Sequence, residues 1–241
     1  MKLSIIIPTL NEETIVKKNL SLISRQLSAI SNELSTEIII ADGGSSDRTV
    51  EVAKRFADKV CISYTGRGIQ MNTGAKASEG DLLLFLHADS LFSVSGIQSM
   101  LEVMQDDRVT GGAFKLKIDS TDSTGLRNNR VSLKTISSFA NIRSKIFNIV
   151  YGDQGIFVRR DIFYKIGGYP EIPIMEDVEF VITLKKFGKF IILPEYITTS
   201  SRRWDSEGIF YCSLRNWVLI SLYLTGVSPY KLNGWYREHG G

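Results

Sequence analysis

Short apolar runs alternate with amphipathic stretches through the first half of the chain. Residues 2–7, 37–41 and 60–63 are rich in Ile and Val, and each run gives way to polar or turn-forming residues. Between them, apolar side chains recur at helical spacing, as at Ile15 and Leu22. Three strand–helix alternations joined by short loops predict a parallel sheet with right-handed crossovers.

The run from Gly80 to Ser90, GDLLLFLHADS, ends abruptly in a histidine and an aspartate. Leu82 to Leu86 are continuously apolar, which is typical of a strand buried on both faces of a parallel sheet. Asp89 is therefore expected at the carboxyl end of this strand, where α/β sheets bind ligands and a carboxylate can hold a metal ion against a phosphate. An aspartate that begins a turn or caps the next helix is the alternative of equal weight.

Turn-forming residues mark the change from strand to helix in the first two units. Pro8 is expected to end the first strand, because proline cannot continue a central ladder. Asn11 is then a candidate N-cap, and Ser46 or Asp47 is a candidate N-cap for the second helix. Small residues recur over 66–77, and they would let a helix approach the sheet or a ligand closely.

The second half of the chain predicts a different sequence of elements. A helix is expected over 94–104, a half-exposed strand over 111–118, a mobile polar loop over 119–129 and a helix over 133–147. A strand over 154–158, a helix over 161–166, a helix beginning at Glu176-Asp177 and a last strand over 190–193 complete the domain.

An apolar helix is expected between Phe210 and Tyr230. One face would carry Phe210, Leu214, Trp217, Val218, Ser221 and Leu222. Packing of that face on the domain is the commoner outcome for such a helix. Peripheral attachment to a membrane through residues 208–230 is the alternative, supported by Trp217, Tyr223 and Arg215.

Length, charge and cysteine content narrow the class of protein. A chain of 241 residues suits one substantial α/β domain with a C-terminal extension. The net charge of +3 comes from scattered basic residues and argues against a nucleic-acid partner. Cys61 and Cys212 lack metal-ligand spacing, which indicates buried thiols in a reducing compartment. We find no signal-peptide pattern and no apolar run near the ~20 residues that span a membrane, which favours the cytoplasm.

Four polar clusters follow predicted strands or begin predicted helices. They are residues 9–12, Asp42, Asp89 and the pair Glu176-Asp177. Because parallel strands end at one edge of a sheet, these clusters are expected to converge there. Taken alone, Asp42 is better explained by an Asx turn and Asp177 by helix N-terminal charge. A Gly-x-Gly-x-x-Gly turn, a Walker sequence and a nucleophile elbow are all missing from the sequence.

Together these tracts resemble the inverting family 2 glycosyltransferases of the GT-A fold. The matching tracts are Ser4 to Glu13, Ile39 to Thr49, Arg67-Gly68 with Asn72 and Gly74-Ala75, His87-Ala88-Asp89, and Glu176-Asp177. Each is weak alone, whereas all five in this order and spacing are specific. Residues 151–154, 173–177 and 199–204 further resemble a subgroup labelled arsenosugar-biosynthesis glycosyltransferases.

The resemblance implies an α/β fold of the nucleotide-diphospho-sugar transferase type. This is a Rossmann-like, mostly parallel central sheet flanked by helices in a single domain. The glycosyltransferase domain would cover residues 1–205, with a nucleotide-binding half at 1–92 and an acceptor half at 93–205. Residues 206–241 would form a C-terminal helical extension.

The same resemblance implies roles for individual residues. The donor, with a UDP-sugar favoured, would be bound by Pro8, Thr9, Glu12, Asp42, Arg67, Asn72 and Ala88. Asp89 matches the family's metal-binding carboxylate, Asp177 matches its catalytic base, and Glu176 would support catalysis beside it. Asp153, Gln154, Arg202, Arg203 and Trp204 are candidates for contacts with the acceptor or a phosphate. An exposed basic turn with a buried aromatic residue explains the last three equally well.

This chain departs from the family's Asp-x-Asp motif at His87. Residues 87 and 89 point the same way in an extended segment. A metal ion would then have one secure carboxylate, Asp89, with water and the diphosphate completing its shell, which suits Mg²⁺ or Mn²⁺.

The implied function is metal-dependent, inverting transfer of a sugar to the hydroxyl of a small-molecule or lipid-linked acceptor. A sugar-nucleotidyltransferase and a non-catalytic nucleotide-sugar-binding protein are the alternatives. The former is disfavoured because no glycine-rich phosphate loop follows the first strand. A cytoplasmic location, with contact at the inner face of the membrane as an option, and a homodimer are both compatible with the sequence.

Overall fold

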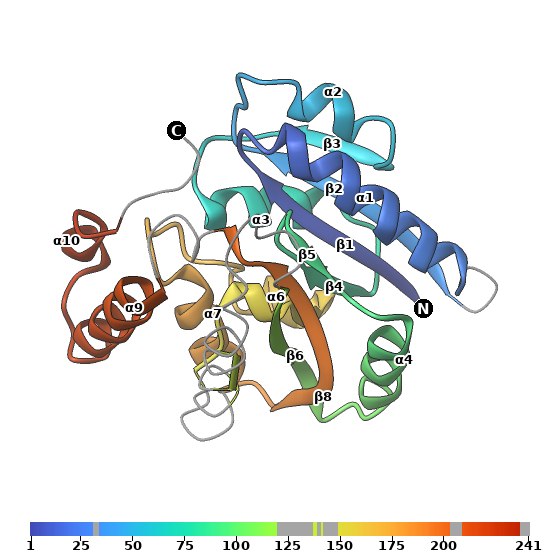
Figure 1. The fold of residues 1–241 in the computed structure, drawn as a ribbon. Helices are drawn as coiled ribbons and strands as arrows, with labels where there is room; N and C mark the ends of the chain where they lie inside the picture. Colours follow the sequence, from blue (N-terminus) through green and yellow to red (C-terminus); the bar gives the residue numbers. More distant parts are fainter. Residues whose placement is uncertain (31–33, 120–136, 139–140, 142–148, 203–208, 237–241) are drawn as a thin grey trace.

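A computed structural model describes residues 1–30, 34–119, 137–138, 141, 149–202 and 209–236 of the chain. Within these residues, eight strands form one sheet in the order β3-β2-β1-β4-β7-β6-β8-β5 (Figure 1). The strands are β1 (Lys2–Thr9), β2 (Ser35–Asp42), β3 (Lys59–Ile62), β4 (Leu82–Phe85), β5 (Ser90–Leu91), β6 (Val109–Asp119), β7 (Ile156–Arg159) and β8 (Lys189–Ser200).

The sheet is mixed, with most strands running in one direction. β3, β2, β1 and β4 pair in parallel, and β6 pairs in parallel with β8. β7 is antiparallel to both β4 and β6, and β5 is antiparallel to β8. The predicted α/β architecture with a mostly parallel central sheet is therefore confirmed, and the antiparallel strands lie in the second half of the chain.

Strand β1 continues through Pro8, so the prediction that this proline ends it was wrong. Pro8 pairs with Ala41 of β2 in register. The carbonyl of Ile6 accepts a hydrogen bond from Leu86 just beyond β4, so even-numbered positions of β1 direct their backbone groups toward β4. At Pro8 the β4 ladder has already ended at Phe85, and the missing N–H leaves no ladder bond unmade.

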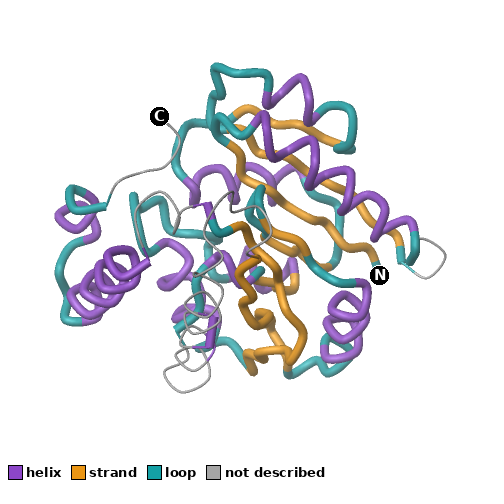
Figure 2. Tube along the Cα trace, viewed as in Figure 1, coloured by secondary structure: helices purple, strands orange, loops and turns teal. Residues whose placement is uncertain are grey.

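The helices cover both faces of the sheet (Figure 2). They are α1 (Glu13–Ser28), α2 (Thr49–Ala53), α3 (Arg67–Ala77), α4 (Val94–Val103), α6 (Arg160–Lys165), α7 (Glu176–Leu184), α9 (Ile209–Leu224) and α10 (Pro229–Asn233), with a 3₁₀ turn at Gly152–Gln154. A Cβ atom at Gly74 of α3 would lie 2.4 Å from Ile6 Cγ2. The small residues of 66–77 thus allow the close approach to the sheet that the sequence predicts.

Alternation along β1 divides its side chains between two cores. Ile5 and Ile7 pack in the cluster that includes Val16 and Leu20 of α1. Ile6 packs in a second cluster with side chains from α3 and α7. Both faces of the central strand are buried, as the continuous apolar run predicts for a parallel sheet.

Several element boundaries differ from the sequence prediction. Asn11 does not cap α1, because its side chain instead accepts a hydrogen bond from the Ser46 N–H at 2.9 Å. Strand β8 extends to Ser200, well beyond the predicted 190–193, because its second half pairs with β6 and with β5. The expected loop at 119–129 and helix at 133–147 lie outside the described residues, except for four isolated positions.

Helix α9 uses a different face for packing from the one the sequence predicted. Leu219 and Ile220 pack against Ile174, Met175 and Val178 at the start of α7. Leu214, Trp217 and Val218 of the predicted face are exposed, whereas Leu222 at its edge packs against the same cluster. In the described part of the chain, none of the helices combines the length and hydropathy required to traverse a bilayer.

Candidate functional site

A cavity of about 130 Å³ lies beyond the carboxyl ends of β4 and β8. Among the residues expected to act, Arg67, Asp89, Asp153 and Asp177 line it, together with His87. The other lining residues are Tyr151, Gly152, Ile174, Met175, Thr199, Ser200, Asn216, Leu219 and Tyr236. Groups that are far apart in the sequence thus meet at the sheet edge where α/β proteins bind ligands.

Asp89 lies three residues beyond Leu86, where the chain leaves β4. Its Oδ1 accepts hydrogen bonds from Thr199 Oγ1 at 3.2 Å and from Ser90 Oγ at 3.4 Å. Burial raises the pKa of the Asp89 carboxyl, while the positive charge of Arg202 and the Thr199 hydrogen bond oppose that rise. A buried carboxylate of this kind is stabilised by a cation placed beside it.

Glu12 and Arg202 form an ion pair across this end of the sheet. Arg202 Nη2 lies 3.1 Å from Glu12 Oε2, although the two residues are 190 positions apart. Burial raises the pKa of Glu12, Arg202 lowers it, and the nearby charge of Asp89 raises it further. Arg202 therefore sits beside two carboxylates and is exposed enough to meet a ligand.

Asp177 is the second residue of α7 and lies at the cavity wall. Its Oδ2 accepts the Gly152 N–H at 2.6 Å, and its Oδ1 accepts the Val178 N–H at 2.8 Å. These two hydrogen bonds fix the orientation of the Asp177 carboxyl group at the N-terminus of α7. A Cβ atom at Gly152 would lie 2.7 Å from His87 Nε2, so glycine there allows His87 and Asp177 to sit close together.

Glu176 does not line the cavity and instead pairs with Arg67. Arg67 Nε lies 2.6 Å from Glu176 Oε1, and the Glu176 side chain is 2% exposed. Burial raises the pKa of Glu176 to about 7, against the opposing effect of Arg67. Glu176 Oε2 is buried without a hydrogen-bond partner among the described residues. The position of Glu176 thus suits the orientation of Arg67 better than direct contact with a substrate.

Three of the expected residues have side chains engaged within the protein and lie outside this cavity. The Asp42 carboxylate is fully buried and accepts hydrogen bonds from Thr9 Oγ1 and from the backbone N–H groups of Gly44 and Ser45. This is the Asx turn considered as the alternative. Asn72 exchanges two hydrogen bonds of 2.8 Å with the Tyr169 backbone, and Gln154 Nε2 donates to the Phe114 carbonyl.

Pro8, Thr9 and Ala88, which were expected to bind the donor, are not among the residues that line the cavity. Pro8 and Thr9 end β1, and the Ala88 carbonyl accepts a hydrogen bond from Asn19. Arg203 and Trp204 lie outside the described residues.

Sequence reasoning did not predict that the C-terminal segment reaches the cavity. Asn216 and Leu219 of α9 and Tyr236 beyond α10 form part of its wall. The spacing of apolar residues predicted an amphipathic helix here, but it favoured a face on which Leu214, Trp217 and Val218 are exposed.

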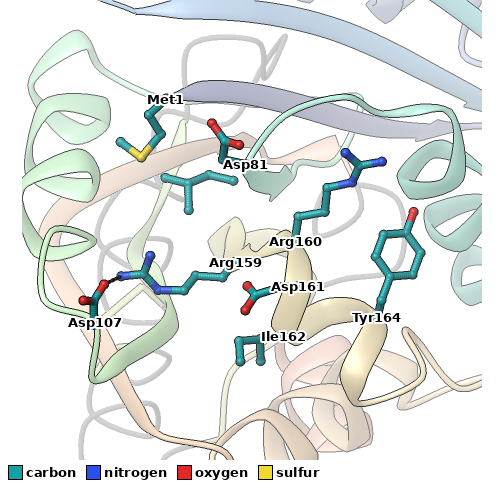
Figure 3. A pocket seen from close by; sticks show the side chains of 9 residues that line it. Met1, Asp81, Asp107, Arg159, Arg160, Asp161, Ile162 and Tyr164 are labelled. Atoms are coloured by element: carbon teal, nitrogen blue, oxygen red, sulfur yellow. Dashed lines mark ion pairs between the residues drawn. The ribbon is translucent and has the colours of Figure 1, made fainter.

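A larger hollow of about 780 Å³ lies at the opposite edge of the sheet (Figure 3). It is lined by Met1 and Asp81, which precede β1 and β4, and by Arg159, where the antiparallel β7 ends. The Arg159 guanidinium donates to the carbonyls of Met104 and Val109. This arginine is therefore held by the protein, and none of the residues expected to act lies in this hollow.

Residues 4–167 match the family described as "Glycosyl transferase family 2". The chain belongs to this family. The prediction that it is a family 2 glycosyltransferase is thereby confirmed, while membership of the arsenosugar subgroup stays a prediction.

Two curated relatives of this family 2 chain are longer than the part that it matches. It is 25% identical over 222 residues to the probable glycosyltransferase YdaM of Bacillus subtilis, covering 86% of this chain and 51% of the relative. It is 27% identical over 186 residues to an uncharacterized glycosyltransferase of Haemophilus influenzae, covering 76% and 61%. The chain spans about half to three fifths of the length of these relatives.

Three solved structures share the fold of this family 2 chain. S. aureus TarS 1–349 in complex with UDP-GlcNAc has a TM-score of 0.62 at 18% identity, covering 83% of this chain and 58% of that one. The mannosyltransferase PcManGT from Pyrobaculum calidifontis, with GDP-Man and Mn²⁺, has a TM-score of 0.59 at 18% identity, covering 82% and 56%. Glucosyl-3-phosphoglycerate synthase from Mycobacterium tuberculosis, with Mn²⁺, UDP and glucosyl-3-phosphoglycerate, has a TM-score of 0.56 at 17% identity, covering 81% and 70%. The GT-A fold is thereby confirmed.

Proposed function

We propose that this family 2 chain transfers a sugar from a nucleotide-diphosphate-sugar to an acceptor hydroxyl with inversion at the anomeric carbon. The observation that carries the proposal is the meeting of Asp89, Asp177 and Arg67 around one cavity at the carboxyl edge of the sheet. A metal-anchoring carboxylate, a proton acceptor and a guanidinium are the three groups that such a reaction requires.

The donor would bind through the first 92 residues. Arg67 offers its guanidinium to a phosphate, and Glu12, paired with Arg202, lies beside Asp89. Asp42 would act from within its turn by shaping the loop that meets the nucleotide. UDP is the favoured nucleotide, because TarS and glucosyl-3-phosphoglycerate synthase bind UDP compounds, while PcManGT with GDP-Man makes GDP the competing choice.

The residues present fit a divalent cation that is shared with the diphosphate. Both hydrogen bonds that described residues donate to Asp89 end on Oδ1, and His87 lines the same cavity. Across the described ranges, no group of three His, Cys, Asp or Glu side chains is arranged to hold a metal by itself. Asp89 would hold the ion, with His87 beside it, and phosphate oxygens and water would complete the shell. Mg²⁺ or Mn²⁺, when bound, would neutralise charge on the departing diphosphate.

Asp177 would remove the proton from the acceptor hydroxyl. Its fixed backbone hydrogen bonds hold the carboxylate at the cavity wall, and inversion requires the acceptor to approach opposite the leaving nucleotide. The acceptor would enter through the half formed by residues 93–205 with the helical extension at 206–241, because α9 and Tyr236 form one side of the cavity. The position of Asp153 in the wall suits contact with the acceptor.

A nucleotide-binding screen tests the donor assignment. Thermal unfolding is followed with UDP, GDP, dTDP and CDP, each with and without Mn²⁺, because a ligand that binds only the folded chain raises its apparent stability. We expect UDP with Mn²⁺ to give the largest rise, and release of UDP from a matching UDP-sugar to be lost in Asp177→Asn. A chain that binds UDP-sugar but never releases UDP is a binding module. A folded chain that binds no nucleotide under either condition contradicts the proposal.

A further inference from the structure

Helix α9 has two unlike faces. Cys212, Leu219 and Ile220 are buried, and Leu219 and Ile220 pack against the start of α7. Tyr223 on the same side donates a hydrogen bond from its hydroxyl to Glu179 of α7. The helix is thus fixed to the domain along one side, at the edge of the molecule (Figure 1).

The opposite face of α9 exposes large apolar side chains over its whole described length. Successive helical residues turn by about 100°, so the outward positions fall within an arc of about 140°. Ser221 is the single small polar residue in that arc. The others are Tyr211 (58% exposed), Leu214 (67%), Trp217 (42%), Val218 (43%) and Leu224 (54%). Continuous exposed apolar surface of this kind marks a contact site.

The residues that follow α9 continue the exposed aromatic surface. Tyr230 and Trp235 are exposed at and just beyond α10, and Lys231 between them is exposed as well. From residue 208 to residue 236 the chain has two basic residues and no aspartate or glutamate. Arg215 is buried, with its guanidinium over the rings of Tyr211 and Tyr236, so Lys231 is the exposed positive charge of this segment. Aromatic rings with a polar edge beside sparse positive charge are typical of helices that lie in the headgroup region of a bilayer.

We propose that the outer face of α9, with the residues around α10, docks on an anionic lipid surface. A lipid surface is favoured over a second copy of the chain by charge. A symmetric pair through this face would add a second Lys231, and residues 208–236 of neither copy supply a carboxylate to pair with it. Anionic headgroups supply the missing negative charge.

Docking on lipid would also define the acceptor class, a step that rests on the proposed function. Asn216 and Leu219 on the inner side of α9 line the cavity that holds Asp89 and Asp177. One helix, about 10 Å across, therefore separates the reaction cavity from the outer apolar face. An acceptor hydroxyl carried on a lipid would be presented close to Asp177.

Vesicle flotation of the full chain tests the docking. Vesicles of phosphatidylcholine alone are compared with vesicles of phosphatidylcholine and phosphatidylglycerol. The test variant is Leu214→Ser with Val218→Ser, and the matched control is Ile62→Ser with Tyr64→Ser, two side chains that are 63% and 86% exposed at β3. Both doubles leave the net charge unchanged. We expect the wild type and the control to float with anionic vesicles, and the test variant to lose binding about tenfold.

The possible outcomes separate the docking from the donor assignment. Failure of the wild type to bind either vesicle, equal loss of binding in the control, or a wild-type dimer that the test variant converts to monomer without vesicle binding would each overturn the docking. Trp217→Ser repeats the test with one side chain if the double variant does not fold. UDP binding, measured by calorimetry without vesicles, is expected to be the same in all variants. Vesicle binding without UDP binding would overturn the donor assignment alone.

Discussion

Arg67 Nε donates a hydrogen bond to Glu176 Oε1 across 2.6 Å, joining the first residue of α3 to the first residue of α7. The carboxylate raises the pKa of Arg67, so the guanidinium stays charged. Because Asp177 follows Glu176 directly, one ion pair connects the group that would meet the donor phosphate to the helix that carries the proposed base. Glu176 is therefore a positioning residue.

The burial of Glu176 beside Arg67 predicts that the free energy of unfolding depends on pH. Burial raises the pKa of Glu176 from 4.5 to about 7, so the folded chain binds a proton there more readily than the unfolded chain. That stabilisation is complete below pH 4.5 and is lost as the pH rises through about 7. Urea unfolding between about pH 5 and pH 8 should show a steeper fall in the free energy of unfolding for the wild type than for Glu176→Gln, by up to about 3 kcal/mol. Parallel curves would contradict this account.

Replacement of Asp177 by asparagine is expected to separate transfer from folding and donor binding. A general base contributes about 10²–10⁴ to the rate, so transfer by Asp177→Asn should fall by that factor. The amide also places N–H groups against backbone N–H groups, at a cost of about 1–3 kcal/mol in stability. Single-turnover transfer and UDP calorimetry measure the two effects. Asp161→Asn, an exposed carboxylate on α6, is the control. Wild-type rates in Asp177→Asn would remove it from the mechanism.

The pattern of the first 90 residues predicted the sheet because its strands β1, β2 and β4 are buried on both faces. Runs such as Leu82 to Leu86 have no other stable placement in a chain of this size. Strand β8 has mixed surroundings, and there the local pattern predicted only residues 190–193. The rest of the strand depends on pairing with β6 and β5. The prediction that Pro8 ends β1 was wrong for the same reason, because the neighbouring strand β4 ends before it reaches Pro8.

The candidate site was predictable only as far as strand ends could be placed. Asp89 and Asp177 follow from topology, since each lies where an element meets the carboxyl edge of the sheet. Asn72 and Gln154 did not follow, because an amide that holds the backbone and an amide that holds a ligand look alike in sequence. The partner of Glu176 was equally hidden, because it lies more than 100 residues earlier in the chain.

Replacement of Asp89 should weaken nucleotide binding without weakening the fold. The ionised carboxylate is penalised by burial, so Asp89→Asn is expected to be at least as stable as the wild type when no ligand is present. Its affinity for UDP in the presence of Mn²⁺ should fall about tenfold or more, and the difference between affinities with and without Mn²⁺ should shrink. Calorimetry in both conditions measures this. Asp107→Asn, a fully exposed carboxylate, is the control. An undiminished Mn²⁺ effect in Asp89→Asn would show that another group anchors the ion.

Replacement of Asn72 tests whether this residue binds the nucleotide, as the family resemblance implies, or stabilises the fold. Its side chain holds both the N–H and the carbonyl of Tyr169, and this joins α3 to the segment before α7. Asn72→Ala leaves those two backbone groups without their partners, so the free energy of unfolding should fall by about 1–3 kcal/mol. Affinity for UDP, measured well below the melting temperature, should change less than threefold, or about 0.7 kcal/mol. Thr73→Ala, one residue along the same helix, is the control for helix α3 itself. A large loss of UDP affinity with unchanged stability would place the Asn72 amide on the nucleotide instead of on Tyr169.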